Sequence, residues 1–494
     1  MSVSELPARP NLEHLKNQAR VLLRERRAAN PSENFKLADA LHQVANDYGF
    51  ATWPALKLHV EVASEDPQAA LAAAIRSDDA SLVRSVLVRH PQLKATINEP
   101  SPAASFGSPA LFMAVHRANH EVIDALLEAG ANVNQRSHWW AGSFGVLDSA
   151  SPELSAFLIS RGAVLDIHAA SRLGMIDQVR EMLARDPQLV HARGGDGQLP
   201  LHFAANVEIA KLLLDHGADV NARDIDHEST AAQYMVSCHP ARLDAARLLI
   251  AHGAETDILM ACAVGDLALV ERIVNNDPET IRITASEHYF PKQNPESGGC
   301  IYIFCFGITK TPHIIAHQFG HTAVFEFLMQ RSAPWLRLTQ AAEIGDEPRL
   351  DEIMRNHPTL FARLSPLAAR RIIGAAVRSN ARAVELLLQR GWPADATLEN
   401  KQTALHFAAW HGNLAMVRAL VAHGAPINVF EAEHGGSPLA WALHGSLHSW
   451  LRDKGDYPGV TQALLAAGAQ IPQPDGPLQA SEEVLEILRA YASV

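Results

Sequence analysis

Several hallmarks of other protein classes are missing from this sequence of 494 residues. No uncharged apolar stretch reaches the roughly 18 residues of a membrane-spanning helix, and no apolar segment of the secretory type follows the first residues. Basic residues number 42 against 54 acidic ones, the net charge is −12, and no run of five like charges occurs. Nucleic-acid binding normally requires a basic surface. We therefore expect no membrane and no nucleic acid among the partners.

Cysteine is scarce, because the chain has only four, and none belongs to a paired CxxC motif. Cys238 and Cys262 stand in helix-like segments, whereas Cys300 and Cys305 are separated by four residues in a stretch rich in β-branched and aromatic side chains. The simplest interpretation is a reduced cytoplasmic protein. A Cys300–Cys305 disulfide is the alternative.

Catalytic signatures are missing as well. The sequence contains no phosphate-binding loop, no GxGxxG or GxSxG motif and no protein-kinase signature. The stretch GGDGQ (194–198) has the composition of a turn, and we interpret it as a hairpin turn rather than a nucleotide cradle. The motifs therefore identify no enzyme class and no cofactor.

What the chain does contain is a repeated unit. Three segments align with one another, LPLHFAANVEIAKLLLDHGADVNARD (199–224), KTPHIIAHQFGHTAVFEFLMQRSAP (310–334) and TALHFAAWHGNLAMVRALVAHGAPINV (403–429). Each reads as a short helix, a tight turn, a second helix with leucine or valine at helical spacing, and a stop at small residues. Internal repeats of this period indicate a stacked array, which suits a chain too long for one ordinary core.

These segments strongly resemble the ankyrin repeat. The resemblance implies an all-α ankyrin-repeat solenoid, which we count as about twelve units between residues 66 and 474. One such unit cannot bury its own apolar face, so neighbouring units must stack. The pattern places Leu213 in the buried stripe of a second helix. Glycines just past second helices should adopt a left-handed conformation, at Gly217, Gly253, Gly424 and Gly468.

The two ends of the chain differ from the repeats. Residues 1–64 predict three helices, with Asn11 placed to cap the first. This block resembles the segment LPxRPxLExLxxQA…YGFxxWPxLKxHVE that precedes ankyrin arrays in many bacterial proteins. We expect a helical cap over the first repeat, with a partner-docking helix pair as the alternative. The solenoid spans 65–474, and 475–494 reads as a C-terminal capping helix.

Two hairpins depart from the repeat pattern in the first half of the chain. SHWWAGSFGVLD (137–148) puts adjacent tryptophans where small and acidic residues are normal, either for binding or as a staple over an irregular unit. RDIDHESTAAQY (223–234) concentrates Asp224, Asp226, His227 and Glu228 at a hairpin tip. These groups either pin a turn, form an acid–base pair or bind a metal ion.

A third departure lies between residues 285 and 307. The interval from Pro278 to Thr311 is 33 residues, whereas the equivalent interval from Pro187 to Leu199 is 12. CIYIFCF has the composition of a strand and NPESGG that of a turn. We therefore predict one extended β-hairpin insertion.

The fourth departure, ALHGSLHSWLRDKGDY (442–457), adds ten residues between a first and a second helix, in an insertion near 445–459. His444 and His448 share one face if the helix continues. Their spacing is that of HExxH zinc sites, but the glutamate is missing and Gly445 weakens the helix. A general-base histidine positioned by an aspartate and a histidine packed beside a tryptophan are the alternatives, and we assign no metal.

Two functions follow from these departures. The first, which the ankyrin resemblance implies, is a binding scaffold whose concave groove engages a protein partner. The alternative is a small-molecule-binding protein or enzyme whose site is enclosed between the long hairpin and the 445–459 insertion. Candidate catalytic residues are Asp226, His227, His288, Tyr289 and His444. Candidate binding residues are His138, Trp139, Trp140, Lys292, Tyr302, Trp410, Trp441, His448, Trp450 and Arg452.

The motifs together also resemble a subgroup of bacterial ankyrin proteins, and that resemblance implies the fold without implying an activity. A single site requires His227, His288 and His444 to converge.

Overall fold

A computed structural model describes residues 6–7, 10–30, 35–63, 66–472 and 478–492. The chain divides into two compact units, residues 1–231 and 232–494, and each is described by itself. The described residues form helices and no strands. Isolated β-bridges occur only at three loop bases, Pro100–Pro109, Arg223–Thr230 and Thr397–Thr403. The predicted all-α repeat architecture is confirmed.

Unit 1 begins with three helices that share a core of their own. Asn11 caps the first helix by accepting from the amides of Glu13 and His14 at 2.8 and 3.2 Å, as predicted. Leu15, Leu23 and Leu56 are buried between the helices, and α3 packs on the first repeat helix, α4. The helices are α1 (Leu12–Ala29), α2 (Leu37–Asp47) and α3 (Trp53–Val62).

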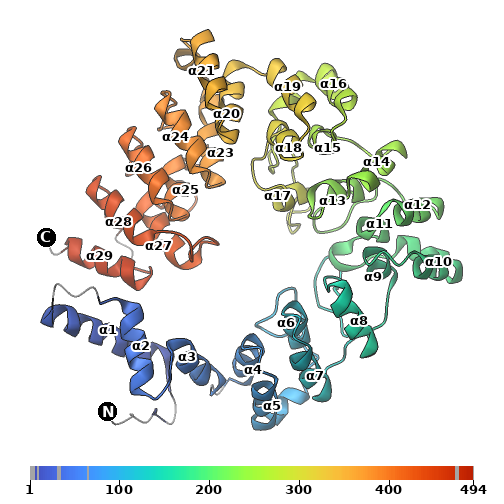
Figure 1. Ribbon diagram of the computed structural model, residues 1–494, viewed down its shortest axis with the longest axis vertical. Helices are drawn as coiled ribbons and strands as arrows, with labels where there is room; N and C mark the ends of the chain where they lie inside the picture. Colours follow the sequence, from blue (N-terminus) through green and yellow to red (C-terminus); the bar gives the residue numbers. More distant parts are fainter. Residues whose placement is uncertain (1–5, 8–9, 31–34, 64–65, 473–477, 493–494) are drawn as a thin grey trace. The chain divides into compact units, whose positions relative to one another are not determined.

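The rest of unit 1 consists of short helices that follow one another in antiparallel pairs (Figure 1). One helix, α8, has no first helix before it, so its unit is irregular. The helices are α4 (Pro67–Arg76), α5 (Ala80–Arg89), α6 (Ala110–His116), α7 (His120–Glu128), α8 (Pro152–Ser160), α9 (Ile167–Arg172), α10 (Ile176–Arg185), α11 (Pro200–Phe203) and α12 (Val207–Asp215).

Unit 2 continues the pairing, from α13 at the boundary to the C-terminal α29. The helices are α13 (Ala231–Ser237), α14 (Leu243–Ala251), α15 (Ile258–Val264), α16 (Leu267–Asn276), α17 (Ile301–Cys305), α18 (Pro312–Gln318), α19 (Thr322–Arg331), α20 (Pro334–Ile344), α21 (Glu347–Asn356), α22 (Pro366–Ala369), α23 (Arg371–Val377), α24 (Ala381–Gln389), α25 (Ala404–Trp410), α26 (Leu414–Ala422), α27 (Pro438–His448), α28 (Tyr457–Ala466) and α29 (Glu482–Ala492). The prediction of a capping helix falls on α29 and on residues 475–477 and 493–494, which lie outside the described residues.

Histidines at the start of first helices join each repeat to the next. In unit 1, His202 Nδ1 accepts from the amide of Leu199 at 3.2 Å, while Nε2 lies 3.1 Å from the carbonyl oxygen of Ser229 in the following hairpin. In unit 2, His406 makes the same two contacts, with Thr403 and Gly436. Both imidazoles are buried. These two histidines therefore have a structural role.

Second helices end as the sequence predicts. The four glycines just past them have φ between 79° and 90°, a left-handed conformation that glycine adopts without steric cost. Leu213 is completely buried on α12. The glycines that end the second helices and the buried Leu213 therefore lie where the repeat pattern predicts.

The extended β-hairpin predicted for residues 285–307 is wrong. Residues 301–305 of CIYIFCF form the helix α17 instead of a strand. The contacts of its tyrosine explain this conformation. Tyr302 and Phe306, four residues apart, stack with ring centroids 5.1 Å apart, and Tyr302 donates a hydrogen bond to Asp257 at 2.9 Å. Tertiary packing therefore outweighs β-propensity, which is strongly dependent on context.

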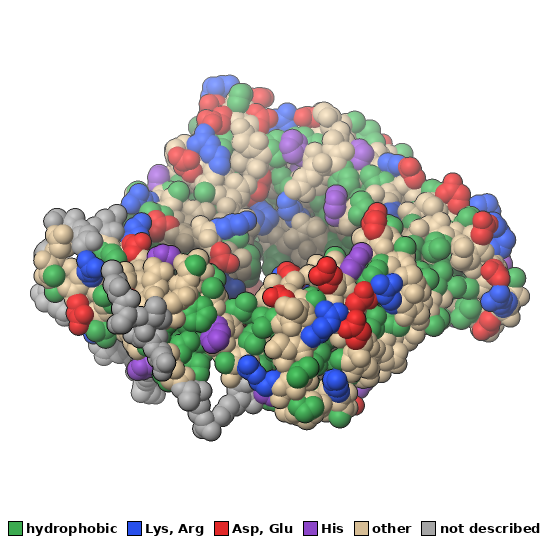
Figure 2. Space-filling view, turned by 60° about the horizontal axis from the view of Figure 1, so that its bottom comes forward, with side chains coloured by type: hydrophobic (Ala, Val, Ile, Leu, Met, Phe, Trp, Pro, Cys, Tyr) green, Lys and Arg blue, Asp and Glu red, His purple; other side chains and the backbone are tan. Residues whose placement is uncertain are grey.

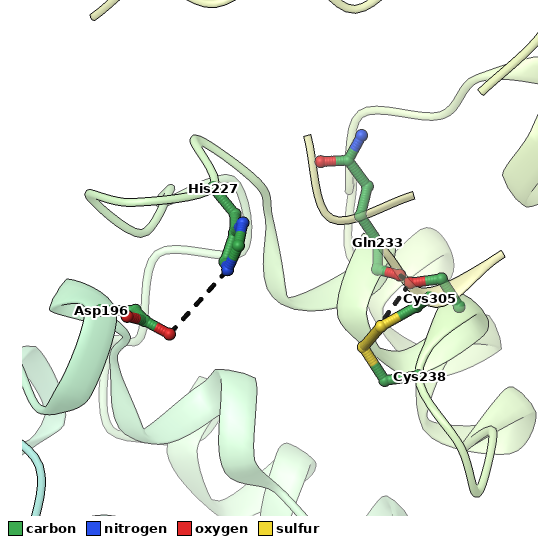
Figure 3. The surroundings of a disulfide bond; sticks show 6 residues. Asp196, His227, Gln233, Cys238 and Cys305 are labelled. Carbon is green, nitrogen blue, oxygen red and sulfur yellow. Dashed lines mark hydrogen bonds and ion pairs between the residues drawn. A yellow bond between two sulfur atoms is a disulfide. The ribbon is translucent and has the colours of Figure 1, made fainter. Parts of the chain in front are cut away.

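The cysteine prediction also needs correction. Cys238 forms a disulfide with Cys305, 67 residues later, with Cα atoms 5.0 Å apart (Figure 3). Cys262 and Cys300 are buried and do not belong to this disulfide. Cys300 lies at the N-terminal cap of α17 and Cys305 is its last residue, so the two cysteines stand at opposite ends of this helix. The prediction of a reduced chain is thus wrong for two of the four cysteines, and a cytoplasmic location stays a prediction.

Charged side chains of both signs are mixed on the surface. On the face shown in Figure 2, Lys and Arg side chains alternate with Asp and Glu side chains instead of gathering in one basic area. Among the described helices, none is both long and apolar enough to cross a bilayer.

We expect Leu213→Asp to unfold unit 1, because it places an unpaired charge in the buried stripe. Val164→Asp is the matched control, since Val164 is 71% exposed in the same unit. Urea unfolding followed by circular dichroism measures both variants. Equal stability of the two variants would contradict the assignment of Leu213 to the core.

We expect non-reducing peptide mapping to recover Cys238 cross-linked to Cys305, also in a Cys300→Ala variant. Reduction should lower the free energy of unfolding of unit 2 by up to about 4 kcal/mol, the entropic value for a closed loop of this length. Recovery of both cysteines as alkylated free thiols, without reduction, would refute the pairing.

Candidate functional site

Three hairpin loops of unit 1 lie in direct contact, loops 136–145, 193–198 and 223–230. Glycines make the contact close. A Cβ added to Gly142 would lie 2.2 Å from the carbonyl oxygen of Gly194, and one added to Gly197 would lie 2.4 Å from Ile225. Only a residue without a side chain allows such an approach. GGDGQ is therefore a hairpin turn, as predicted, and its glycines let neighbouring repeats meet.

The backbone of loop 223–230 is held from both sides. The carboxylate of Asp224 accepts from the amides of His227 and Ser229, both at 2.7 Å. The carbonyl oxygen of Asp196 accepts from the amides of Ile225 and Asp226 at 2.9 and 3.1 Å. Asp224 thus has the turn-pinning role that was one of the predicted alternatives, and Asp226 and His227 are fixed relative to the preceding loop.

Asp196, Asp226 and His227 form a cluster in these loops. His227 Nε2 lies 3.7 Å from Asp226 Oδ2 and 3.9 Å from Asp196 Oδ2. Figure 3 shows the side chains of His227 and Asp196 directed toward each other from separate loops. One ligand atom from each of the three residues lies within 4.8 Å of the other two. All three side chains are at most 15% exposed.

The electrostatics of the cluster are dominated by burial. Burial raises the pKa of Asp196 to about 6, the negative charges of Asp226 and Asp224 add to the rise, and the charge of His227 opposes it. The indole of Trp139 interacts with the carboxyl group of Asp196 and slightly lowers its pKa. Neither Asp196 Oδ1 nor the indole Nε1, both of which are buried, forms a hydrogen bond of normal geometry. The cluster therefore concentrates negative charge away from water.

The HWW motif borders this cluster. Trp139 is half-buried, with its ring 5.0 Å from that of Phe106 and 6.2 Å from that of Trp140. Trp140 is 42% exposed. His138 is exposed, and its amide donates to the carbonyl oxygen of Gly107 at 3.0 Å. Trp139 thus covers a contact between loops, whereas Trp140 and His138 remain accessible.

The insertion of unit 2 that precedes α18 places its predicted site residues in different surroundings. His288 is exposed and packs edge-on against Tyr289 at 4.6 Å, and Lys292 pairs with Glu287 at 3.4 Å. Tyr302, by contrast, is completely buried. We therefore correct Tyr302 from a binding residue to a core residue.

A second group of predicted residues does come together, at the C-terminal end of unit 2. Trp410 on α25 lies 6.3 Å from Trp441 and 5.6 Å from His444 on α27, and 6.1 Å from Trp450 in the following loop. His444 and His448 stack at 4.3 Å, because α27 continues through both. We call these five side chains, Trp410, Trp441, His444, His448 and Trp450, the C-terminal aromatic surface.

The loop that carries Trp450 is fixed on α25. Gly445 permits this, since a Cβ there would lie 2.5 Å from the carbonyl oxygen of Trp410. Tyr457 donates to that same carbonyl at 2.8 Å, and the amide of Asp456 donates to the carbonyl of Gly412 at 2.9 Å. The loop is therefore packed against the preceding repeat. Gly445 does not interrupt α27, and its lack of a side chain allows the close contact with Trp410.

The acidic residues of this loop do not position the histidines. Asp453 lies 3.8 Å from Arg452, which is exposed. The side chain of Asp456 caps α28 by accepting from the amide of Gly459 at 2.8 Å. The predicted alternative of a histidine general base oriented by Asp453 or Asp456 therefore lacks its orienting contact.

The two insertions contact different helices. The base of the 285–307 insertion meets α23, where Arg371 donates to the carbonyl of Arg282 at 2.8 Å and Arg378 to that of Thr309 at 3.1 Å. The 449–456 loop meets α25. His227 belongs to unit 1, whereas His288 and His444 belong to unit 2.

One cavity in unit 1, of about 390 Å³, is lined by none of the predicted site residues. It lies beside α9 and α10, between Arg136, Asp166, His168, Arg185 and Arg193.

One residue of the Asp196, Asp226 and His227 cluster was not singled out from the sequence. Asp196 belongs to GGDGQ, which was interpreted only as a turn. Asp196 lies one hairpin before residues 223–230, and hairpins of successive repeats stack. That position was the signal in the sequence that Asp196 adjoins Asp226 and His227. Asp226 and His227, which were singled out, acquire their third neighbour from that stacking.

Comparison with known proteins identifies the repeats. The family model described as "Ankyrin repeats (3 copies)" matches residues 167–260 and 372–472, and that described as "Ankyrin repeat" matches 106–138.

Several curated proteins share short regions with the chain. It is 51% identical over 49 residues, 9% of its length, to the serine/threonine-protein kinase VIK of Arabidopsis thaliana. It is 31% identical over 126 residues, 24% of its length, to the ankyrin repeat and SAM domain-containing protein 6 of Rattus norvegicus. It is 40% identical over 70 residues, 14% of its length, to the NF-kappa-B inhibitor cactus of Drosophila melanogaster. The matched regions span only 11%, 14% and 14% of these relatives, respectively.

We expect Asp224→Ala to loosen loop 223–230, because two amide hydrogen bonds to a buried carboxylate are lost. The free energy of unfolding of unit 1 should fall by about 2 kcal/mol, and the amides of His227 and Ser229 should exchange faster with deuterium. Asp219→Ala is the matched control, since that exposed carboxylate accepts one amide bond, from Asn221. Unchanged exchange at His227 and Ser229 would show that Asp224 does not hold the loop.

Proposed function

Because this chain contains ankyrin repeats, we propose that it is a scaffold that binds a protein partner through the C-terminal aromatic surface. Ankyrin arrays present extended surfaces and carry no inherent chemistry. The name of one similar protein, the NF-kappa-B inhibitor cactus, describes a protein that acts on another protein. These similarities favour protein binding over catalysis as the function of the array.

The exposure of Trp450 carries the proposal. This side chain is 69% exposed although its ring contacts Trp410 at 6.1 Å and His411 at 5.1 Å. A large aromatic side chain held in water by an otherwise well-anchored loop is costly unless a partner covers it. Tryptophan is also enriched among the residues that dominate binding energy.

The surface is preorganised for binding. The Trp450 loop is anchored at its C-terminal end, where the amide of Asp456 donates to the carbonyl of Gly412 just past α25. Trp441 packs against His406 and Phe407, each at 5.3 Å. Little conformational entropy is then lost when a partner docks. Trp410 and Trp441 lie on first helices, which in an ankyrin array line the concave groove, so the proposal places the partner in that groove.

The contact is expected to be largely apolar. Partial burial lowers the pKa of His444 from its ordinary value, and the neighbouring charges of His448 and His434 lower it further. His444 is therefore mainly neutral at neutral pH. A partner with an apolar or aromatic segment fits this surface better than a strongly acidic one.

The alternative, a small-molecule or enzyme site enclosed between the two insertions, has less support. The two segments contact different helices, α23 and α25, and the acidic residues beside His444 are engaged elsewhere. We therefore do not extend the catalytic hypothesis to His288, Tyr289 or His444.

The experiment captures a partner at the surface and then measures its affinity. A photo-crosslinking amino acid at position 450 should trap a protein that the same group at position 367 does not, since Leu367 is 60% exposed in the same unit but distant from the proposed surface in sequence. With that protein purified, Trp450→Ala should weaken binding about tenfold or more, the range of a binding hot spot. Leu367→Ala should leave the affinity unchanged.

Equal effects of the two substitutions would refute the C-terminal aromatic surface as the binding site. Circular dichroism of both variants confirms that each remains folded.

A further inference from the structure

The donor atoms of Asp196, Asp226 and His227 are suited to a metal ion. Two carboxylate oxygens and one imidazole nitrogen form a mixed set of the kind that binds first-row transition ions. Two ligands on opposite sides of an ion with bonds of about 2.1 Å lie roughly 4.2 Å apart. The distances from His227 Nε2 to the carboxylate oxygens of Asp226 and Asp196, 3.7 and 3.9 Å, are shorter than this limit. All three donors lie within 4.8 Å of one another. A single ion therefore reaches them after small side-chain rotations.

The loops hold these donors in place. Asp196 belongs to one hairpin and Asp226 and His227 to the next, and the carbonyl of Asp196 bonds both Ile225 and Asp226 through their amides. Asp224 fixes the far side of the second loop through the amides of His227 and Ser229. Rigid placement of ligands by their surroundings is a general feature of protein metal sites.

The carboxylate of Asp196 is incompletely satisfied by hydrogen bonds. Its Oδ1 is buried and forms no hydrogen bond of normal geometry, although the indole of Trp139 interacts with it. Arg193 in the same loop donates instead to the carbonyl oxygens of Gly197 and Arg223. A buried acceptor without a well-aligned donor is unfavourable, and a cation bound by this carboxylate would satisfy it.

Among the described residues, other histidine–carboxylate pairs lack this combination. His434 lies 3.9 Å from Glu433, but these side chains are 73% and 59% exposed. His168 lies 4.0 Å from Asp166, whose carboxylate is shared with Arg136. The unit 1 cluster is thus distinguished by two carboxylates, one histidine and burial together.

We propose that Asp196, Asp226 and His227 bind one divalent transition-metal ion, Zn²⁺ or Mn²⁺ by the chemistry of the donors. Three protein ligands leave coordination positions for water or for a donor from another molecule. The ion joins the hairpins of two successive repeats. The site does not depend on the partner proposed above, which binds unit 2.

The test uses the full chain, freed of metal with a chelator and titrated calorimetrically with Zn²⁺ and with Mn²⁺. Co²⁺ serves as a third probe, because its visible absorption reports coordination. The variants are Asp196→Asn, Asp226→Asn and His227→Ala. Asp196→Asn is conservative, since the φ of 55° at this position is tolerated by asparagine. His434→Ala is the matched control, a histidine near a carboxylate at the same distance in a solvent-exposed loop.

We expect one tight site for Zn²⁺ or Mn²⁺ in the wild type and in His434→Ala, and at least about tenfold weaker binding in each cluster variant. Melting curves of the metal-free proteins identify any variant that fails to fold, and the two asparagine variants then decide the result.

Two outcomes overturn the proposal. One is wild-type protein that binds none of the three ions more tightly than folded Asp226→Asn does. The other is a tight site that His227→Ala retains and His434→Ala loses.

Discussion

Each helix pair of this chain buries its apolar face only against the next pair, and the structure depends on that constraint. A unit of two such short helices cannot form a core alone. The buried histidines His202 and His406 show how the contact is made specific, since each bonds its own helix start and the backbone of the following hairpin. The same stacking brings the hairpin loops of unit 1 together and creates the Asp196, Asp226 and His227 cluster.

The regular part of this architecture could be predicted from the sequence because its determinants are local. Helix caps, left-handed glycines and the buried stripe of Leu213 follow from residue type and spacing, and the structure confirms them. The predictions that failed depend on contacts distant in sequence. CIYIFCF has strand composition, but the hydroxyl of Tyr302 is bonded to Asp257, 45 residues away. The disulfide joins cysteines separated by 67 residues, and no spacing rule selects that pair.

The candidate sites follow the same division. The sequence singled out Asp226 and His227 but not Asp196, because the third side chain comes from the preceding repeat. It also singled out the five members of the C-terminal aromatic surface without predicting that they adjoin. Their contacts depend on Gly445, which allows α27 and Trp410 to approach closely. Tyr302 shows the opposite error, since an aromatic residue in an insertion is equally suited to a core.

The central claim is that the repeats supply the fold and that the departures from the repeat supply the binding. The most direct measurement replaces residues 446–455 with a two-residue turn of the regular type and compares the partner affinity and thermal stability of this chain with those of the wild type. The account predicts a folded protein with similar melting behaviour that has lost most of its affinity for the captured partner. A folded deletion variant that binds the partner as tightly as the wild type would contradict it.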